Sequence, residues 1–257
     1  MNNTDQTIKI TECPRDAMQG IHDFIPTDVK AKYINLLLQV GFDTLDFGSF
    51  VSPRAIPQMQ DTAEVLKKLD LSTTRSKLLA IIANYRGAED AAQHDEITYL
   101  GYPFSISETF QQRNANTSIA DAFDTVKRIN ELCSVKNKEL LVYLSMGFGN
   151  PYGDEWNVEI VQKWTGRLVS EGINIIALSD TVGVATPAQI NEIYPALCNT
   201  FPELNLGCTC MPPQITGNSK LKLPIIAAAN VLMLLLKVME AARWPKMSLQ
   251  AISLLKT

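Results

Sequence analysis

The sequence has little of what nucleic-acid-binding and membrane proteins require. Its 23 Lys and Arg residues are outnumbered by 27 Asp and Glu residues, which gives a formal net charge of −4, and no basic run occurs. This charge balance argues against a nucleic-acid surface. The longest apolar run, Pro224 to Leu236, is too short to cross a bilayer. We therefore expect neither a nucleic-acid partner nor a membrane partner.

Cysteine is also sparse, and its spacing argues against a zinc site. The five cysteines are scattered, and only Cys208 and Cys210 lie close together. No second close pair completes a four-ligand pattern, so reduced thiols are the simplest interpretation. The first residues, Met1 to Asp5, are polar and resemble neither a signal peptide nor a transit peptide. We expect a cytoplasmic protein.

Short apolar segments alternate with amphipathic ones along most of the chain. Parallel strands that are buried on both faces read as short apolar runs, and their covering helices show apolar residues at helical spacing. We expect strands at residues 8–13, 42–47, 77–82, 96–100, 139–145, 173–178 and 204–208. We expect helices at residues 27–40, 57–69, 88–93 and 158–171 and from residues 118 and 186, with a polar loop at 105–116.

This order predicts one α/β domain with the architecture of a (β/α)8 TIM barrel. An open doubly wound sheet is the rival, but no Gly-x-Gly-x-x-Gly turn follows the first expected strand. Polar residues collect just after the expected strands, at the end where such a barrel places its active site. They are Arg15, Asp16, Asp46, Ser145 and Asp180.

Two interpretations of the adjacent charges Arg15 and Asp16 are open from these two residues alone. They can form a solvated surface ion pair, worth about 0–1 kcal/mol. Alternatively, the carboxylate of Asp16 can bind a divalent cation while the guanidinium of Arg15 stabilises a developing oxyanion. The rest of the chain decides between them.

Four groups of residues resemble the motifs of the 3-hydroxy-3-methylglutaryl-CoA lyase family, in the metal-dependent TIM-barrel lyase and synthase superfamily. The resemblance covers Ile8 to Cys208 in order, and the second group is the most specific, because related synthases lack it. The groups are Pro14–Gln19; Ser49–Arg54 with Pro57–Met59; Ser107–Phe110 with Asn114; and Asp180–Gly183 with Thr186 and Pro187.

The resemblance implies a carbon–carbon lyase that splits 3-hydroxy-3-methylglutaryl-CoA into acetyl-CoA and acetoacetate. A Mg²⁺ or Mn²⁺ ion on the tertiary hydroxyl would lower its pKa, and hard cations prefer oxygen ligands, so Asp16 is the expected metal ligand. Arg15 would stabilise the acetyl-CoA enolate. Asp180 would act as a catalytic residue that orients the substrate or the base.

The same resemblance implies further site residues. Gln19, Ser145 and Thr181 are expected to contact the acyl-CoA substrate. Asp46 replaces a family Glu and has two open roles, one behind the metal ligands and one purely structural. A homodimer is also implied.

The resemblance stops near Cys208. The family's seventh strand carries His-x-His, which supplies two further metal ligands, whereas this chain has Gly207-Cys208-Thr209-Cys210-Met211 there. The only histidines, His22 and His94, follow no expected strand and are expected at the surface. Asn150 replaces a Cys, and the family's catalytic-cysteine loop and asparagine ligand are missing.

We interpret this break as a reading-frame shift just after Cys208. One lost base would convert a His-Leu-His-Ala sequence into codons that read Thr209-Cys210-Met211. The same shifted frame permits Gly-Tyr-Gly-Gly-Cys-Pro-Met-Ala from Lys237 to Pro245, and Asp-Glu-Leu-Thr-Gly-Asn from Lys246 to Ile252. These are the missing cysteine loop and asparagine. A naturally divergent C-terminus is the alternative.

Residues 1–208 are then the barrel domain, and residues 209–257 are an aberrant tail. The barrel would be incomplete after the start of strand seven, with its eighth strand either absent or improvised from the apolar tail. With one metal ligand left of the family's four, we expect this chain to be inactive or weakly active. Two other functions are open: a Claisen-type synthase or aldolase of the same superfamily, and a non-catalytic binding or scaffold protein.

Overall fold

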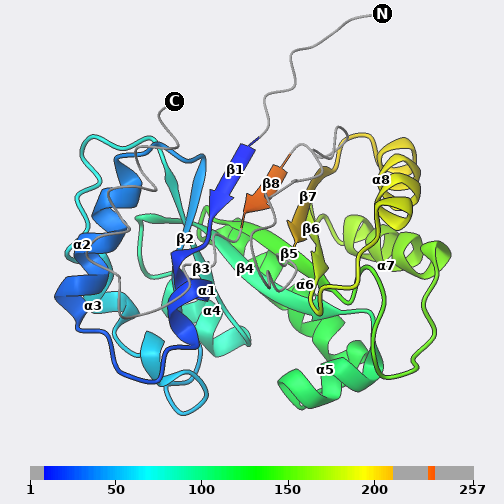
Figure 1. The fold of residues 1–257 in the computed structure, drawn as a ribbon, viewed down its shortest axis with the longest axis horizontal. Coiled ribbons are helices and arrows are strands. Elements are labelled where there is room, and N and C mark those ends of the chain that lie inside the picture. Colours follow the sequence, from blue (N-terminus) through cyan, green and yellow to red (C-terminus); the bar gives the residue numbers. More distant parts are fainter. Residues whose placement is uncertain (1–8, 211–230, 235–257) are drawn as a thin grey trace, which may run out of the picture.

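The protein is a ring of eight parallel strands surrounded by helices, as seen in a computed structural model that describes residues 9–210 and 231–234 (Figure 1). Each strand pairs with the next in sequence order, and the eighth pairs with the first, so the sheet closes. The (β/α)8 class is therefore confirmed. The strands are β1 Lys9–Glu12, β2 Thr44–Ser49, β3 Lys77–Ile81, β4 Ile97–Ser105, β5 Glu139–Ser145, β6 Ile175–Asp180, β7 Asn205–Cys210 and β8 Val231–Leu234.

Of the two expectations for the eighth strand, improvisation from the apolar tail is the one observed. β8 comes from the Pro224–Leu236 run, and its four residues pair in parallel with both β7 and β1. The flanking residues 211–230 and 235–257 lie outside the described part of the chain. The expected division at residue 208, and the proposed restored motifs, fall largely in this part and stay predictions.

Helices follow the strands and lie on the outside of the ring (Figure 1). Several begin at a capping side chain: Ser118, Asn157 and Thr186 each accept a hydrogen bond from a backbone N–H of the first helical turn. The helices are α1 Pro14–Gln19, α2 Thr27–Leu38, α3 Thr62–Leu66, α4 Tyr85–Ala91, α5 Glu108–Ala115, α6 Ile119–Val135, α7 Val158–Ser170 and α8 Pro187–Thr200, with a 3₁₀ turn η1 at Pro57–Met59.

Several local expectations were wrong, and the expected strand at 96–100 runs on to Ser105. The segment expected as a loop at 105–116 contains α5, because Ser107 caps a helix that ends at Asn116 in the left-handed conformation. The helix expected at 57–69 is divided into η1 and α3. A short helix, α1, directly follows β1, and it carries the Arg15–Asp16 pair.

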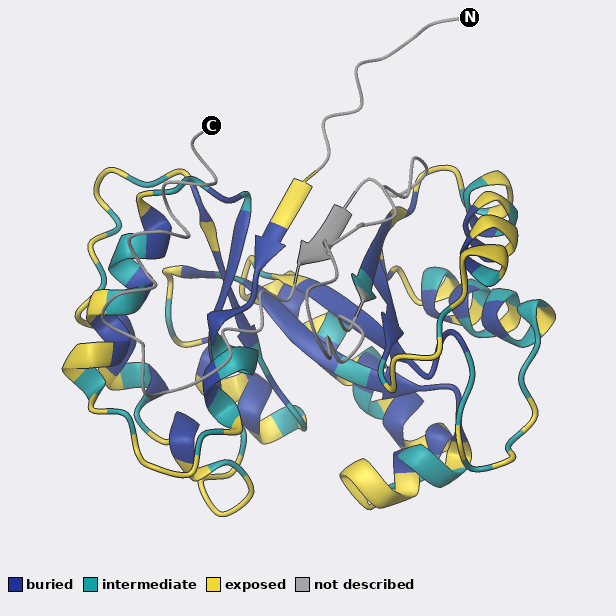
Figure 2. Cartoon of the chain, in the orientation of Figure 1, coloured by how far each residue is buried: buried dark blue, intermediate teal, exposed yellow. Residues whose placement is uncertain are grey.

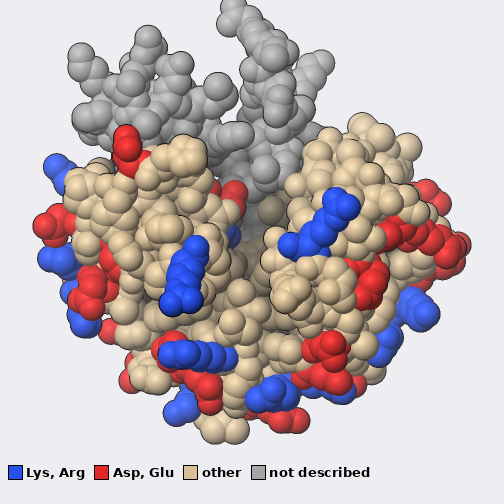
Figure 3. Space-filling model, turned by 90° about the horizontal axis from the view of Figure 1, so that it is seen from below, with Lys and Arg blue, Asp and Glu red and all other residues tan. Residues whose placement is uncertain are grey.

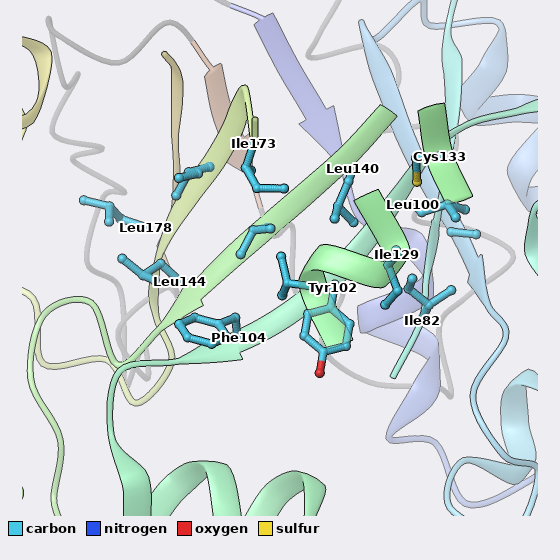
Figure 4. Packing of buried hydrophobic residues seen from close by; sticks show 14 of the residues in the cluster. Ile82, Leu100, Tyr102, Phe104, Ile129, Cys133, Leu140, Leu144, Ile173 and Leu178 are labelled. Atoms are coloured by element: carbon cyan, nitrogen blue, oxygen red, sulfur yellow. The ribbon is translucent and has the colours of Figure 1, made fainter. Parts of the chain in front are cut away.

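The buried residues form two layers that follow the two faces of the strands (Figure 2). The larger layer lies between sheet and helices, where Leu100 and Tyr102 of β4 meet Ile129 and Cys133 of α6 (Figure 4). The smaller layer fills the inside of the ring and consists of Cys13, Leu79, Tyr99, Leu141, Tyr143 and Ala177. Among the described helices, none is long and apolar enough to cross a membrane.

Candidate functional site

The carboxyl ends of the strands meet at one face of the ring, which is hollowed near its centre (Figure 3). Because every pairing is parallel, residues that follow different strands come together at this face. Arg15 and Asp16 follow β1, Asp46 lies on β2, and Ser145 ends β5. This is where the sequence predicted the site to lie.

Arg15 is the centre of a hydrogen-bonded group of four side chains. Its Nε donates to Asp46 Oδ1 at 3.2 Å and Oδ2 at 3.1 Å, and its Nη2 donates to Asp46 Oδ2 at 2.6 Å. Its Nη1 donates to Asp16 Oδ1 at 3.1 Å and to Gln19 Oε1 at 2.9 Å. Gln19 Nε2 in turn donates to Asp16 Oδ1 at 2.7 Å. Four predicted site residues therefore contact one another directly.

The short helix α1 produces this arrangement. Pro14 occupies its first turn, where the missing N–H needs no partner. Helical spacing then puts Gln19 one turn after Arg15 and Asp16, so the amide reaches both charged groups. The cluster is partly buried: the side chain of Asp46 is 0% exposed, that of Arg15 12% and that of Asp16 28%.

Burial and pairing act in opposite directions on these charges. Burial raises the pKa of Asp46 to about 6, and the Arg15 guanidinium opposes this rise. Burial alone would lower the pKa of Arg15, but the Asp46 carboxylate overcomes it and raises that pKa above its ordinary value. Arg15 therefore stays cationic. Within the described contacts, one N–H of Nη2 is left to meet a ligand oxygen.

Asp180 and Thr181 lie at the same face, but each accepts a hydrogen bond from a backbone N–H of a neighbouring loop. Asp180 is buried, and its Oδ1 accepts a hydrogen bond of 2.8 Å from the N–H of Val184. Thr181 Oγ1 accepts one of 3.0 Å from the N–H of Met146, directly after Ser145. The structure thus brings these residues to the site's rim and gives each a loop-shaping contact. Their predicted roles toward a substrate stay predictions.

The described residues do not make a complete metal site. No group of three or more His, Cys, Asp or Glu side chains in the described part of the chain is arranged to hold an ion. Asp16 offers one partly exposed carboxylate, whereas the carboxylate of Asp46 is occupied by Arg15. A single carboxylate falls short of the several oxygen ligands that Mg²⁺ or Mn²⁺ requires.

Neither histidine forms a hydrogen bond or ion pair with this cluster in the described part of the chain. His22 is exposed in the segment after α1. His94 is half-buried after α4, where its ring centroid lies 5.4 Å from that of Phe50. Asn150, at the position of a family Cys, accepts hydrogen bonds from the N–H groups of Tyr152 and Asp154 and so shapes the β5–α7 loop.

Two buried polar residues near the site carried no prediction. Glu12 is the last residue of β1, and burial, followed by the charge of Asp46, raises its pKa to about 8. Tyr143 points into the ring among the residues of the smaller layer. A polar residue inside an apolar strand is the signal that could have identified both.

Comparisons with known proteins agree on one family. The HMGL-like family model matches residues 8–210. Hydroxymethylglutaryl-CoA lyase of Bacillus subtilis is 33% identical over 189 residues, which are 74% of this chain and 62% of that protein. The chain thus spans less than two thirds of the length of the first curated relatives it matches.

Solved structures give the same result. A crystal structure of the Bacillus subtilis HMG-CoA lyase has a TM-score of 0.74 and 31% identity, covering 79% of this chain and 68% of that one. An HMG-CoA lyase from Acinetobacter baumannii, in complex with coenzyme A and 3-methylmalate, has a TM-score of 0.73 and 28% identity, covering 81% and 68%. With the family model matching most of its length, this chain belongs to the HMGL-like family.

Proposed function

We propose that this chain derives from a 3-hydroxy-3-methylglutaryl-CoA lyase, which cleaves its substrate to acetyl-CoA and acetoacetate. The observation that carries the proposal is the Arg15 guanidinium, fixed by Asp46 and Asp16 at the carboxyl ends of β1 and β2. A fixed cation at the carboxyl ends of the strands is suited to a negative oxygen that develops during bond cleavage. The lyases among the relatives support this choice of substrate.

Each residue of the cluster has a proposed role. Arg15 stabilises the enolate oxygen of the departing acetyl-CoA. Asp46 holds Arg15 in place without touching the substrate, and Gln19 fixes the second side of the guanidinium while offering its amide to the substrate. Ser145 and Thr181 contact the bound molecule, and Asp180 orients the substrate or the base.

Mg²⁺ or Mn²⁺ is proposed as the cofactor of the intact protein only. Such an ion would supply the acidity of the substrate's tertiary hydroxyl. Asp16 would provide one ligand, and the His-x-His and Asn of the restored frame would provide the others. The family match ends at residue 210, next to the proposed frame shift, which supports this interpretation.

The proposed ligand is an acyl-CoA, supported by the coenzyme A in the Acinetobacter baumannii lyase structure. A homodimer and the absence of nucleic-acid and membrane partners are proposed from the sequence. A cytoplasmic location is proposed as well; one relative from rat is a cytoplasmic lyase, and others are mitochondrial.

The test compares two proteins: the 257-residue chain and a version whose frame is restored after Cys208. With Mg²⁺ and 3-hydroxy-3-methylglutaryl-CoA, we expect acetoacetate from the restored protein and little or none from the chain as it stands. Robust acetoacetate production by the 257-residue chain would contradict its predicted inactivity. A restored protein that fails to cleave this substrate would contradict the family function, and sequencing around codon 208 tests the frame shift itself.

The related synthase or aldolase remains the second candidate enzyme, because it would share Arg15 and Asp16. The Ser49–Arg54 segment speaks against it. Profiling the restored protein with other acyl-CoA substrates separates the two enzymes. A scaffold protein that lost its ligands by drift would show scattered substitutions, whereas the break here is abrupt.

A further inference from the structure

Two segments that follow neighbouring strands are joined by one carboxylate. The helix α5 follows β4, and the loop of residues 146–157, here called the β5–α7 loop, follows β5 (Figure 1). Asp154 of this loop accepts hydrogen bonds at Oδ2 from the Ser107 hydroxyl and from the N–H of Thr109, the latter at 2.9 Å. Its Oδ1 accepts from Thr109 Oγ1 at 2.8 Å. The partners are 47 and 45 residues apart in the sequence, so the contact connects separate elements.

The partners of Asp154 belong to the N-terminal end of α5. Ser107 is the N-cap, and its Oγ also accepts a hydrogen bond of 3.1 Å from the N–H of Phe110. The N–H of Thr109 is one of those that a first helical turn leaves without an intrahelical partner. The hydrogen bonds from Ser107 and Thr109 lower the pKa of Asp154 below its ordinary value, so the carboxylate is charged at neutral pH. A negative charge is favourable at this end of a helix.

The β5–α7 loop holds the backbone of Asp154 by contacts of its own. Asn150 Oδ1 accepts from the N–H groups of Tyr152 at 3.0 Å and Asp154 at 3.1 Å, and its Nδ2 donates to the Asp154 carbonyl oxygen at 2.9 Å. Gly153, directly before Asp154, has a φ of 78°, which residues with a side chain rarely adopt. The carboxylate is therefore presented to α5 from a fixed turn.

An aromatic contact joins the same two segments. The ring of Tyr152 stacks on that of Phe110, with centroids 6.3 Å apart and an interplanar angle of 26°. The guanidinium of Arg113 lies 4.9 Å from the centroid of the Tyr152 ring. Since Phe110 and Arg113 are one helical turn apart, the loop contacts α5 beyond its first residues.

The N-terminal end of α5 is connected in turn to the end of β5. Ser105 Oγ accepts from the N–H of Ser107 at 3.0 Å and donates to the Ser107 carbonyl oxygen at 3.1 Å. Ser105 is the register partner of Ser145, whose carbonyl oxygen accepts from the N–H of Ile106 at 3.2 Å. A displacement of α5 would therefore be transmitted to Ser145, which is proposed to contact the substrate.

We propose that Asp154 is a positioning residue that locks the β5–α7 loop to α5, so that the two segments move as one unit and hold Ser145 in place. Asp154 does not touch the substrate. The effect on acyl-CoA binding rests on the proposed function, whereas the lock between the two segments does not. Loss of the carboxylate should release both segments, because it removes the hydrogen bonds that join them.

The test measures amide hydrogen exchange in the 257-residue chain at neutral pH. In Asp154→Ala we expect exchange to accelerate by about 10-fold or more both at residues 107–110 and at residues 146–157. A carboxylate that only capped α5 would affect residues 107–110 alone. In Asp154→Asn the amide can still accept from Ser107 and donate to Thr109 Oγ1, so exchange should stay within about threefold of the wild type.

Asp121→Ala is the matched control. Asp121 also accepts a hydrogen bond from an N-cap serine, at 2.6 Å from Ser118 Oγ, but both residues belong to α6 and its cap. This variant should accelerate exchange only at the start of α6. Thr109→Val removes a single hydrogen bond of the lock, and it should accelerate exchange in both segments by a smaller factor even if Asp154→Ala does not fold.

Binding is measured by calorimetric titration with 3-hydroxy-3-methylglutaryl-CoA in the presence of a chelator. We expect Asp154→Ala to raise Kd by about threefold or more and Asp121→Ala to leave it unchanged. This readout separates a positioning role from a purely structural one, because both variants remove a helix-capping carboxylate.

The outcomes separate this inference from the proposed function. Acceleration confined to residues 107–110 in Asp154→Ala and Thr109→Val would refute the lock. Acceleration in both segments with an unchanged Kd would refute the positioning role while the proposed function stands. A wild-type chain that does not bind the thioester overturns the proposed function for this chain, and the exchange data then decide the lock without it.

Discussion

At the scale of single residues, the site depends on how Asp46 neutralises Arg15. The carboxylate is fully buried and accepts hydrogen bonds from two nitrogens of the guanidinium. Two charges taken out of water stabilise each other only while both are present. The pair therefore fixes a cation at the carboxyl ends of β1 and β2, and replacing either member alone should cost more stability than replacing both.

We predict that Asp46→Leu destabilises the chain by about 3–5 kcal/mol, because Arg15 loses its buried counter-ion and keeps only the partly exposed Asp16. The double variant Arg15→Met/Asp46→Leu should lose clearly less free energy of unfolding than the sum of the losses in the two single variants. Urea unfolding measures all four proteins of this cycle. The exposed pair Lys67–Glu64 is the control, with a coupling below about 0.5 kcal/mol. Additive losses at Arg15 and Asp46 would contradict the prediction.

Glu12 predicts a pH dependence of stability. Burial, followed by the charge of Asp46, raises its pKa from 4.5 to about 8, so between these values the folded chain binds more protons than the unfolded chain. The free energy of unfolding should therefore be highest below about pH 4.5, as far as this group is concerned, and fall as the pH rises toward about 8.

Melting temperatures across this range test the effect of Glu12. In Glu12→Gln the decline between about pH 5 and pH 8 should be much smaller, because the uncharged amide does not ionise. The exposed Glu64→Gln variant should retain the wild-type decline. Equal pH profiles for wild type and Glu12→Gln would show that Glu12 does not control stability here.

At the scale of elements, the side-chain amide of Gln58 in η1 forms hydrogen bonds with the backbone of the segment that follows α1. Gln58 is buried; its Nε2 donates to the carbonyl oxygens of Ile21 and Asp23, and its Oε1 accepts from the N–H of Ile25, each at 2.9 Å. The backbone of Gln58 accepts from Lys30 in turn. The η1 segment of the family motif therefore supports the loop that follows the Arg15 helix.

We expect Gln58→Ala to leave three backbone groups without partners and to destabilise the chain by about 2–3 kcal/mol. Amide hydrogen exchange at residues 20–26 should accelerate more than exchange in β4 or β5. Gln60→Ala, two residues further and exposed, is the matched control and should change neither quantity. Unchanged exchange at residues 20–26 in Gln58→Ala would show that the amide does not hold this loop.

At the scale of the whole molecule, a closed sheet does not imply a complete site. β8 closes the ring through backbone pairing, which requires no particular side chain. Metal ligation needs particular side chains, and in the described residues Asp16 stands without the cluster that would complete it. Fold and activity can therefore be lost separately in this chain.

We predict weak binding of Mn²⁺ by the 257-residue chain. Addition of about 1 mM Mn²⁺ should raise its melting temperature little, because stabilisation by a ligand follows its concentration relative to Kd. The frame-restored protein should be stabilised by several degrees, and Asp16→Asn should abolish that gain. An equal gain in the 257-residue chain would mean that the described residues and the tail make a site of their own.

The sequence by itself predicted the barrel class and the polar residues at the strand ends, both of which follow from local patterns of apolar and polar residues. The choice of Arg15 and Asp16 as site residues came from the resemblance of their motif to a known family and stays a prediction. Where local patterns were weak, the expectations failed: α5 carries few apolar residues, and α1 is too short for a helical period.

Only the tertiary structure decided which side chains meet. The bidentate contact of Arg15 with Asp46, the three backbone partners of Gln58 and the hydrogen bond of Ser107 to Asp154 join residues that are far apart in the sequence. The closure of the ring by Val231–Leu234 is of the same kind. Such contacts depend on strand register and on side-chain packing across the ring, and no single segment of the chain contains that information.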